Sequence, residues 1–305
     1  MQNNSGTDST SKRVTVPVPA GGALTGTLWQ PAGTPPVATV TIHPATAVAE
    51  RLYNGFARYL ADHGFAVFTY DYRGTGAAGA ARENRTLRMR DWMSQDVPAA
   101  ADWMAARFPE LPHLAVGHSV GGQALVLGNA TSHLAGFVAV ASHAGVVADI
   151  EDRPERLRAS LVLHILGPLT ALLLGFVPGR RMGLGEDMPA AAMLEWSRWS
   201  RRPGYFFDDP AMRAAERAAT VRTDVLAVGL TDDLWATPRQ IDGFYAHLVN
   251  ARVERRMYSP ADGGVPAIGH MGFFRSGVSA ALWPELLAWL TEKSGAGCPP
   301  APTPH

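Results

Sequence analysis

Residues 117–121 read GHSVG and match the pattern G-x-S-x-G, with Ser119 at the centre. Such a pattern occurs by chance in glycine-rich chains, so its surroundings decide what it indicates. The apolar residues 114–116 before it predict a buried strand, and the Ala- and Leu-rich residues 122–130 after it predict a helix. A serine on a sharp strand-to-helix turn projects its hydroxyl from the sheet, and only small neighbours fit the cramped backbone. We therefore predict a nucleophile elbow with Ser119 as the nucleophile.

Two adjacent aspartates are the candidates for the acid that such a serine needs. In hydrolases with a nucleophile elbow the acid follows the serine in the chain and precedes the histidine. Residues 224–230 (DVLAVGL) predict an apolar strand, and Asp232 and Asp233 come just after its carboxyl end, where open parallel sheets carry their ligands. The spacing between this strand and Pro238 favours Asp233 as the acid, and Asp232 is the alternative.

The histidine that completes this arrangement is His270, which lies in a loop between two glycines. Its loop follows a predicted strand, residues 253–258, and precedes a predicted helix, residues 280–290. We expect His270 to accept the serine proton as general base and to return it as general acid, while the aspartate orients the imidazole. The prediction depends on all three residue types occurring in this order, each at the end of a strand-like run.

Four stretches make the sequence resemble the α/β-hydrolase family, close to the bacterial branch of serine aminopeptidases and monoglyceride-lipase-like hydrolases. They are DYRGTG at residues 71–76, GHSVGG at 117–122, the aspartates at 232–233 and GHMGFF at 269–274. The resemblance extends from about residue 14 to about residue 290. It implies an α/β-hydrolase fold, a mostly parallel central sheet flanked by helices. It does not indicate a substrate, because one fold hosts many functions.

The predicted oxyanion hole departs from the pattern of this family. Members usually carry His-Gly after the third strand, and the residue behind the glycine donates its backbone N–H. Here residues 43–46 read HPAT, and Pro44 has no N–H to donate. We therefore predict the backbone N–H groups of Val120 and Ala45 as oxyanion donors, with Thr46 as a candidate third donor. Each such donor typically stabilises the transition state by about 3 kcal/mol.

Strand and helix signals alternate along most of the chain, as a parallel sheet covered on both faces requires. After an opening hairpin, residues 13–19 and 23–29, the predicted central strands are residues 37–42, 65–70, 114–117, 137–142, 225–230 and 253–258. The alternation stops for about 80 residues after residue 142, where helical patterns occur without a convincing strand, and a structureless loop of that length is unusual in a compact domain. We predict a disordered leader at residues 1–12 and a hydrolase core in two segments, residues 13–144 and 222–294. Between these segments we predict an inserted helical cap, residues 145–221, and after them a disordered tail, residues 295–305.

The composition of the predicted cap indicates an apolar pocket for an acyl-type group. Its large apolar residues are Leu161, Leu166, Leu169, Leu172, Leu173, Phe176, Trp196, Trp199, Tyr205, Phe206 and Phe207. The residues predicted to contact the substrate are His43, Thr46, His118, His143, Trp196 and Trp199. We expect a small-molecule substrate with a hydrophobic acyl or alcohol part.

Residues 161–177 (LVLHILGPLTALLLGFV) have about the minimum length of a membrane-spanning helix. His164, Gly167 and Pro168 interrupt the run, and arginines flank it on both sides. We therefore predict buried helices of the cap and no integral membrane insertion. A face that touches a membrane peripherally and a membrane-embedded protein are the alternatives.

The overall composition is that of an ordinary globular enzyme, with 305 residues, 47% hydrophobic and 18% charged. Lys and Arg number 27, as do Asp and Glu, so the net charge gives no reason to expect nucleic acid or an anionic membrane as partner. The single cysteine, Cys298, cannot form an intramolecular disulfide, and residues 1–12 lack the apolar stretch of a secretory signal. These features predict a cytoplasmic location, and none of them specifies an oligomeric state.

No pattern in the sequence predicts a metal or a cofactor. Neither His-Glu-x-x-His nor paired Cys and His spacings occur. The G-x-G-x-x-G at residues 74–79 lacks the helix that should begin at once and the acidic residue further on that a dinucleotide site needs. We predict a cofactor-free serine hydrolase that cleaves a carboxylic ester through an acyl-enzyme on Ser119. An amidase or aminopeptidase, thioesterase, lactonase, acyltransferase or C–C hydrolase would use the same residues, and a non-catalytic ligand-binding protein on this scaffold is the alternative from another class.

Overall fold

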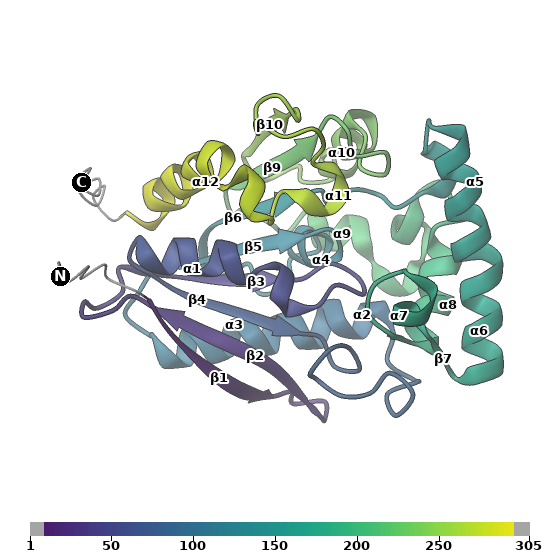
Figure 1. Cartoon of the computed structure of the whole chain (residues 1–305), viewed down its shortest axis with the longest axis horizontal. Helices are drawn as coiled ribbons and strands as arrows, with labels where there is room; N and C mark the ends of the chain where they lie inside the picture. The colour runs from purple at the N-terminus through teal and green to yellow at the C-terminus, as the bar shows by residue number, and fades with distance from the viewer. Residues whose placement is uncertain (1–8, 296–305) are drawn as a thin grey trace, which may run out of the picture.

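An eight-stranded sheet, in the order β1-β2-β4-β3-β5-β6-β9-β10, runs through the part of the chain that the structure describes, residues 9–295 (Figure 1). The structure is a computed structural model of the whole chain. The strands of this sheet are β1 Thr10–Pro17, β2 Ala23–Gln30, β3 Ala38–His43, β4 Phe65–Asp71, β5 His113–His118, β6 Leu134–Val140, β9 Val225–Leu230 and β10 Val253–Tyr258. Every predicted strand is present, and the predicted fold class, a mostly parallel sheet flanked by helices, is confirmed.

The strands from β4 to β10 in this order are parallel, whereas β2 pairs antiparallel with both β1 and β4. All residues of β3, β4 and β9 are buried, because helices cover both faces of the sheet. The parallel arrangement brings the carboxyl ends of β3, β5, β6, β9 and β10 to one edge. The residues that follow these strands therefore meet there, although they are far apart in the sequence.

The prediction of a disordered leader over residues 1–12 is wrong for residues 10–12. β1 begins at Thr10, which pairs with Gln30, and residues 10–12 are part of the hairpin. Strand pairing uses backbone groups, so the polar side chains of these residues do not prevent it. Residues 1–8 of the predicted leader, and residues 296–305 of the predicted tail, lie outside the described residues.

Helices pack on both faces of the sheet (Figure 1). α1 Asn54–Asp62 and α12 Ser279–Ser294 contact each other on one face, and α3 Val97–Arg107 and α4 Val120–Val126 cover the other. The remaining helices and turns outside the β6–β9 connection are η1 Glu50–Leu52, α2 Met89–Asp91, η2 Trp92–Asp96, α10 Pro238–Tyr245, α11 Gly269–Gly272 and η7 Ser276–Val278.

The connection between β6 and β9 is mostly helical and lies beyond the carboxyl ends of the central strands (Figure 1). Its elements are η3 Val147–Asp149, α5 Arg153–Leu161, η4 Val162–Leu166, α6 Gly167–Leu174, β7 Phe176–Val177, α7 Gly179–Met182, β8 Met188–Pro189, α8 Ala190–Trp199, η5 Tyr205–Asp208, η6 Pro210–Met212 and α9 Ala214–Ala218. The expectation that it contains no strand is wrong, since β7 and β8 form a small antiparallel pair. Two-residue strands are too short to produce an alternating pattern in the sequence.

α5, η4 and α6 form one continuous helix, Arg153–Leu174, which we call the α5–α6 helix. It was expected to be interrupted at Pro168, but a π turn keeps it continuous. The N–H of Gly167 donates to the carbonyl of Val162, five residues back. The same widening occurs before Pro98, where Val97 donates to Trp92. A wider turn keeps the helix running where proline has no N–H to donate and its ring crowds the preceding turn.

The α5–α6 helix is also far more exposed than the prediction of buried cap helices requires. It is long and apolar enough to cross a membrane by length and composition, with a mean hydropathy of 1.8, and only 22% of its most apolar window is buried. Leu161, Leu169, Leu172 and Leu173, which were expected to line the pocket, face solvent instead. Composition could not reveal this, because it does not show which face of a helix meets the rest of the protein.

Candidate active site

Ser119 occupies a sharp turn between β5 and α4. Its φ of 51° and ψ of −113° lie in a region that L-residues rarely adopt. The neighbouring glycines make the turn sterically possible. A Cβ at Gly121 would lie 2.2 Å from the carbonyl oxygen of His43, and one at Gly122 would lie 2.0 Å from the hydroxyl of Ser142. The GHSVGG stretch thus forms the strained elbow that its sequence predicts.

The carboxylate of Asp233 holds the imidazole of His270. Nδ1–H of His270 donates to Oδ2 of Asp233 at 2.6 Å, and the other carboxylate oxygen accepts the N–H groups of Trp235 at 2.9 Å and Ala236 at 3.1 Å. Asp233 is 4% exposed, so both of its oxygens are satisfied within the protein. This arrangement leaves Nε2 as the nitrogen of His270 that is available for proton transfer.

Asp232 has a different role from its neighbour. Its carboxylate accepts the backbone N–H groups of Ile268 at 2.7 Å and Gly269 at 3.0 Å. These bonds fix the loop that leads into His270 and do not involve the imidazole. Of the two candidate acids, Asp233 is therefore the one that contacts His270.

Opposing effects set the pKa of Asp233. Burial, the largest of them, raises it, whereas the charge and hydrogen bond of His270 and the N–H of Trp235 lower it, with a net result of about 2. The carboxylate is consequently ionised at neutral pH. A fixed negative charge at this place stabilises the imidazolium that forms when His270 accepts a proton.

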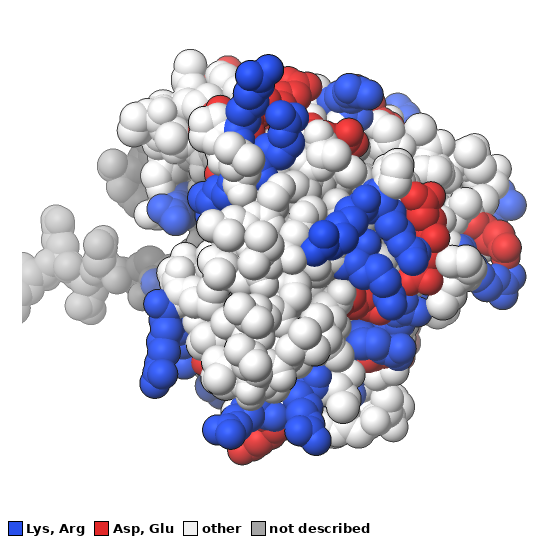
Figure 2. Space-filling model, turned by 90° about the vertical axis from the view of Figure 1, so that its right-hand side faces the viewer, with Lys and Arg blue, Asp and Glu red and all other residues white. Residues whose placement is uncertain are grey.

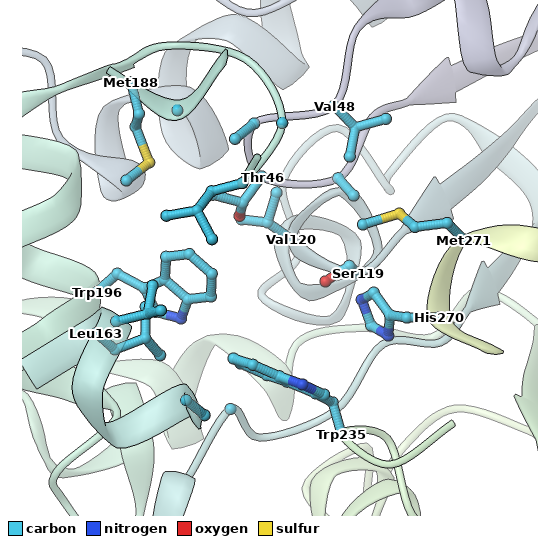
Figure 3. A pocket seen from close by; sticks show the side chains of 18 of the residues that line it. Thr46, Val48, Ser119, Val120, Leu163, Met188, Trp196, Trp235, His270 and Met271 are labelled. Atoms are coloured by element: carbon cyan, nitrogen blue, oxygen red, sulfur yellow. The ribbon is translucent and has the colours of Figure 1, made fainter. Parts of the chain in front are cut away.

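Ser119 and His270 lie next to each other in the lining of a cavity of about 930 Å³ (Figure 3). The labelled walls of the cavity are Thr46, Val48, Val120, Leu163, Met188, Trp196, Trp235 and Met271. The reacting groups therefore lie within a large and mainly apolar space.

Only part of the predicted pocket lines this cavity. Thr46, His143 and Trp196 do, whereas His43, His118 and Trp199 do not. Nδ1 of His43 bonds to the hydroxyl of Tyr70, and Nε1 of Trp199 donates to Asp209, so both side chains are held in the interior. The prediction is wrong for these three residues because nearness in sequence to the elbow or the cap does not determine which way a side chain points.

Sequence reasoning also missed several wall residues, among them Leu163, Met188 and Trp235. The position of Trp235, two residues after Asp233, was a usable signal. Leu163 and Met188 offered none, since apolar residues are common throughout this segment. Of the large apolar residues expected to form the pocket, Trp196 and Tyr205 line it.

His118 belongs to a hydrogen-bond chain that joins three loops around Ser119. Its Nε2–H donates to the backbone carbonyl of His270 at 2.9 Å, so its Nδ1 accepts the hydroxyl proton of Tyr53, also at 2.9 Å. The oxygen of Tyr53 in turn accepts the backbone N–H of Ala45 at 2.8 Å. Burial, together with the nearby charge of His270, lowers the pKa of His118 to about 3. His118 is therefore a neutral structural link at physiological pH.

The hydrogen bonds that join His118, Tyr53 and Ala45 show that the predicted oxyanion hole is wrong at Ala45. The N–H of Ala45 is already bonded to Tyr53 and does not face the cavity as a free donor. The backbone N–H groups of Val120 and Thr46, which both line the cavity, have no hydrogen-bond partner within residues 9–295. They are the donors positioned to meet a developing oxyanion, so Thr46 replaces Ala45 as the candidate.

Replacing Tyr53 with phenylalanine is expected to destabilise the protein by about 1–3 kcal/mol, because two buried groups, the Ala45 N–H and Nδ1 of His118, lose their partner. Chemical denaturation of wild type and variant measures the change. Tyr59→Phe is the matched control, since Tyr59 lies in α1, whose N-cap residue is Tyr53, and its hydroxyl has no hydrogen bond within residues 9–295. Equal destabilisation by both substitutions would show that the Tyr53 hydroxyl has no special role.

The order of these parts along the chain, and their meeting at the carboxyl edge of a mostly parallel sheet, are those of an α/β-hydrolase. The chain belongs to the serine aminopeptidase S33 family, whose model matches residues 34–261. This confirms the resemblance inferred from the four sequence stretches. No curated protein shows significant similarity to the sequence.

Solved structures share the fold at low sequence identity. A soluble variant of monoglyceride lipase from Saccharomyces cerevisiae, in complex with a substrate analogue, has a TM-score of 0.65 at 14% identity, covering 96% of this chain and 97% of that one. A hypothetical protein from Pseudomonas aeruginosa has a TM-score of 0.64 at 14% identity, with 94% of each chain covered. An esterase from Pyrococcus furiosus has a TM-score of 0.56 at 13% identity, covering 94% of this chain and 91% of that one. At these identities the likeness concerns the fold alone.

Proposed function

We propose that this α/β-hydrolase is a serine hydrolase that cleaves carboxylic esters through an acyl-enzyme on Ser119. The observation that carries the proposal is the 2.6 Å bond between Asp233 and His270, in a cavity where the imidazole lies next to the strained Ser119. A buried acid, an oriented base and a nucleophile that lines the cavity are the parts that acyl transfer needs. No cofactor takes part in the proposed reaction.

In the first half of the proposed reaction, Nε2 of His270 accepts the proton of the Ser119 hydroxyl while Oγ attacks the carbonyl carbon of the ester. The negative charge that develops on the carbonyl oxygen is stabilised by the N–H groups of Val120 and Thr46. His270 then donates its proton to the departing alkoxide, which leaves as an alcohol. In the second half, His270 removes a proton from water and the hydroxide attacks the acyl carbon. The bond from this carbon to Oγ of Ser119 then breaks as His270 returns the proton to Oγ, and the carboxylic acid leaves.

The charged groups of the cavity favour an ester over an amino-terminal peptide. A substrate with a free ammonium group needs an unpaired carboxylate as its partner. Glu155 is already bonded to Arg158, and Glu186 is bonded to Arg180 and Arg51. With these carboxylates neutralised and the walls apolar, a hydrophobic acyl or alcohol part fits the cavity better than a cation.

Two further parts of the proposal come from the sequence. The substrate is a small molecule, because a zero net charge offers no general attraction to nucleic acid. The single cysteine is consistent with a cytoplasmic location.

Hydrolysis of p-nitrophenyl esters of increasing acyl length tests the proposal. We expect kcat/KM to rise at least about tenfold from the acetate to the octanoate, because each buried methylene contributes up to about 0.8 kcal/mol. Alanine p-nitroanilide is the matched aminopeptidase substrate and is expected to react more slowly than any of the esters. Faster cleavage of the anilide would contradict the ester assignment. Absence of both turnover and labelling of Ser119 by a fluorophosphonate would contradict serine catalysis and favour a ligand-binding protein.

A further inference from the structure

The outer face of the α5–α6 helix carries a stripe of exposed aliphatic side chains. Its members, which we call the leucine stripe, are Leu157, Leu161, Ile165, Leu169, Leu172 and Leu173. Five of them recur at every fourth residue and so lie on one side of the helix. Their exposed fractions range from 47% to 73%. An apolar surface of this extent on a folded protein usually marks an interaction site.

The inner face of the same helix belongs to the active-site cavity. Ala159, Val162 and Leu163 line the cavity, and Ala171 packs in the core further along. The helix is therefore a wall between Ser119 and the outside. It cannot cross a bilayer without removing this wall from the cavity, so the leucine stripe needs a partner that touches one face of the helix only.

Both signs of charge flank the leucine stripe, but several of the arginines near it are unpaired. Residues 156–185 contain four arginines, of which Arg158 pairs with Glu155 and Arg180 with Glu186 at the two ends of this segment. Arg153, Arg181 and Arg201 form no ion pair with any described residue, and Arg201 donates to the carbonyl of His164 on the helix itself. Figure 2 shows this side of the molecule as a broad uncharged area, with Lys and Arg side chains around it and Asp and Glu beside several of them. The surroundings thus complement an anionic partner.

We propose that the leucine stripe docks on a lipid surface that contains anionic headgroups. The α5–α6 helix lies in the plane of the interface, with the stripe among the acyl chains and the free arginines at the phosphates. The cavity on the other side of the helix then lies next to the lipid layer. An ester dissolved in that layer reaches Ser119 by a short path, and this link to the substrate rests on the proposed function.

A second copy of the chain is a less suitable partner for this face. In a two-fold dimer the same segment contacts itself, so the four arginines of residues 156–185 would approach one another. Arg158 and Arg180 already use Glu155 and Glu186 as partners, and Arg181 has no ion-pair partner among residues 9–295. A lipid surface supplies both the apolar layer and the negative charge.

Co-sedimentation with vesicles tests the docking. The vesicles are phosphatidylcholine with about one third phosphatidylglycerol, and phosphatidylcholine alone. We expect the wild type to sediment with the anionic vesicles. The triple variant Leu169→Ser, Leu172→Ser, Leu173→Ser is expected to partition at least about tenfold more weakly, because each substitution removes an apolar side chain that docking would bury in the lipid. Val249→Ser is the matched control, since Val249 is 70% exposed and lies outside the stripe. The double variant Arg153→Gln, Arg181→Gln is expected to lose binding to the anionic vesicles, while its binding to phosphatidylcholine vesicles stays equal to that of the wild type.

Three results would overturn this docking. The first is equal sedimentation of wild type and triple variant. The second is a wild type that binds no vesicles but is dimeric by light scattering, with a monomeric triple variant. The third is a wild type that alkaline carbonate fails to release from membranes, which would indicate insertion.

Two controls separate the docking from the fold and from the proposed function. The triple variant must melt like the wild type and hydrolyse p-nitrophenyl acetate at the wild-type rate in solution, because none of its three positions lines the cavity. Ser119→Ala must still bind vesicles. Vesicle binding without any ester hydrolysis would therefore contradict the proposed function and leave the docking intact.

Discussion

Ser119→Ala is expected to remove ester hydrolysis, with kcat lower by at least about 10⁴-fold. The substitution deletes the oxygen that forms the acyl-enzyme, and alanine tolerates the φ of 51° about as well as serine does. The backbone carbonyl of Ser119 still accepts the hydroxyl of Ser142, so we expect the fold to be unchanged. Turnover of p-nitrophenyl butyrate and thermal unfolding measure the two effects. His270→Ala should cost about as much, and the double variant no more than either single one, because the groups act as a unit.

Ser142→Ala is the matched control for this loss. Ser142 is buried beside the elbow and donates to the Ser119 carbonyl at 2.9 Å, but it does not line the cavity. We expect it to retain activity within about tenfold of the wild type, since it removes one hydrogen bond behind the nucleophile. Full activity in Ser119→Ala, or loss of activity in Ser142→Ala alone, would move the nucleophile away from Ser119.

Asp233→Asn should lower kcat by about 10⁴-fold while the shape of the site is kept, because an amide cannot stabilise the imidazolium and favours the wrong tautomer of His270. Asp232→Asn is the natural comparison, one residue away and of the same size. Its carboxylate accepts two loop N–H groups and does not touch the imidazole, so we expect a loss within about tenfold. Steady-state kinetics on one ester compares them. A larger loss in Asp232→Asn would reverse the assignment of the acid.

The stability of the wild type relative to Asp233→Asn should fall as the pH is lowered. The pKa of Asp233 is about 2 in the folded protein, below its ordinary value of 3.8. The carboxylate therefore contributes stability above about pH 4, and this contribution is lost as the pH falls toward 2. The difference in unfolding free energy between wild type and Asp233→Asn should shrink over that window. A difference that stays constant would show that the ionised carboxylate does not stabilise the fold.

Much of the fold could be predicted because its signals are local. The apolar runs at residues 225–230 and 253–258 coincide with β9 and β10, and the GHSVGG stretch forms the turn that its glycines permit. The continuity of the α5–α6 helix could not be predicted from the sequence. The sequence shows Gly167 and Pro168 as interruptions, whereas a π turn lets the helix continue past them. Both π turns are closed by the residue directly before a proline, but a proline inside a helix more often ends or kinks it, so the sequence did not indicate that the helix continues.

Short stretches of the chain and the order of its strands were enough to predict the class of fold, the nucleophile elbow and the order of serine, acid and histidine. The tertiary structure decided which aspartate contacts His270, that Tyr53 occupies the N–H of Ala45, and that the leucine stripe faces outward. Each of these depends on the direction of a side chain or N–H group relative to segments far away in the sequence. Such directions follow only from packing of the whole chain, since one residue type can point into a cavity, a core or solvent.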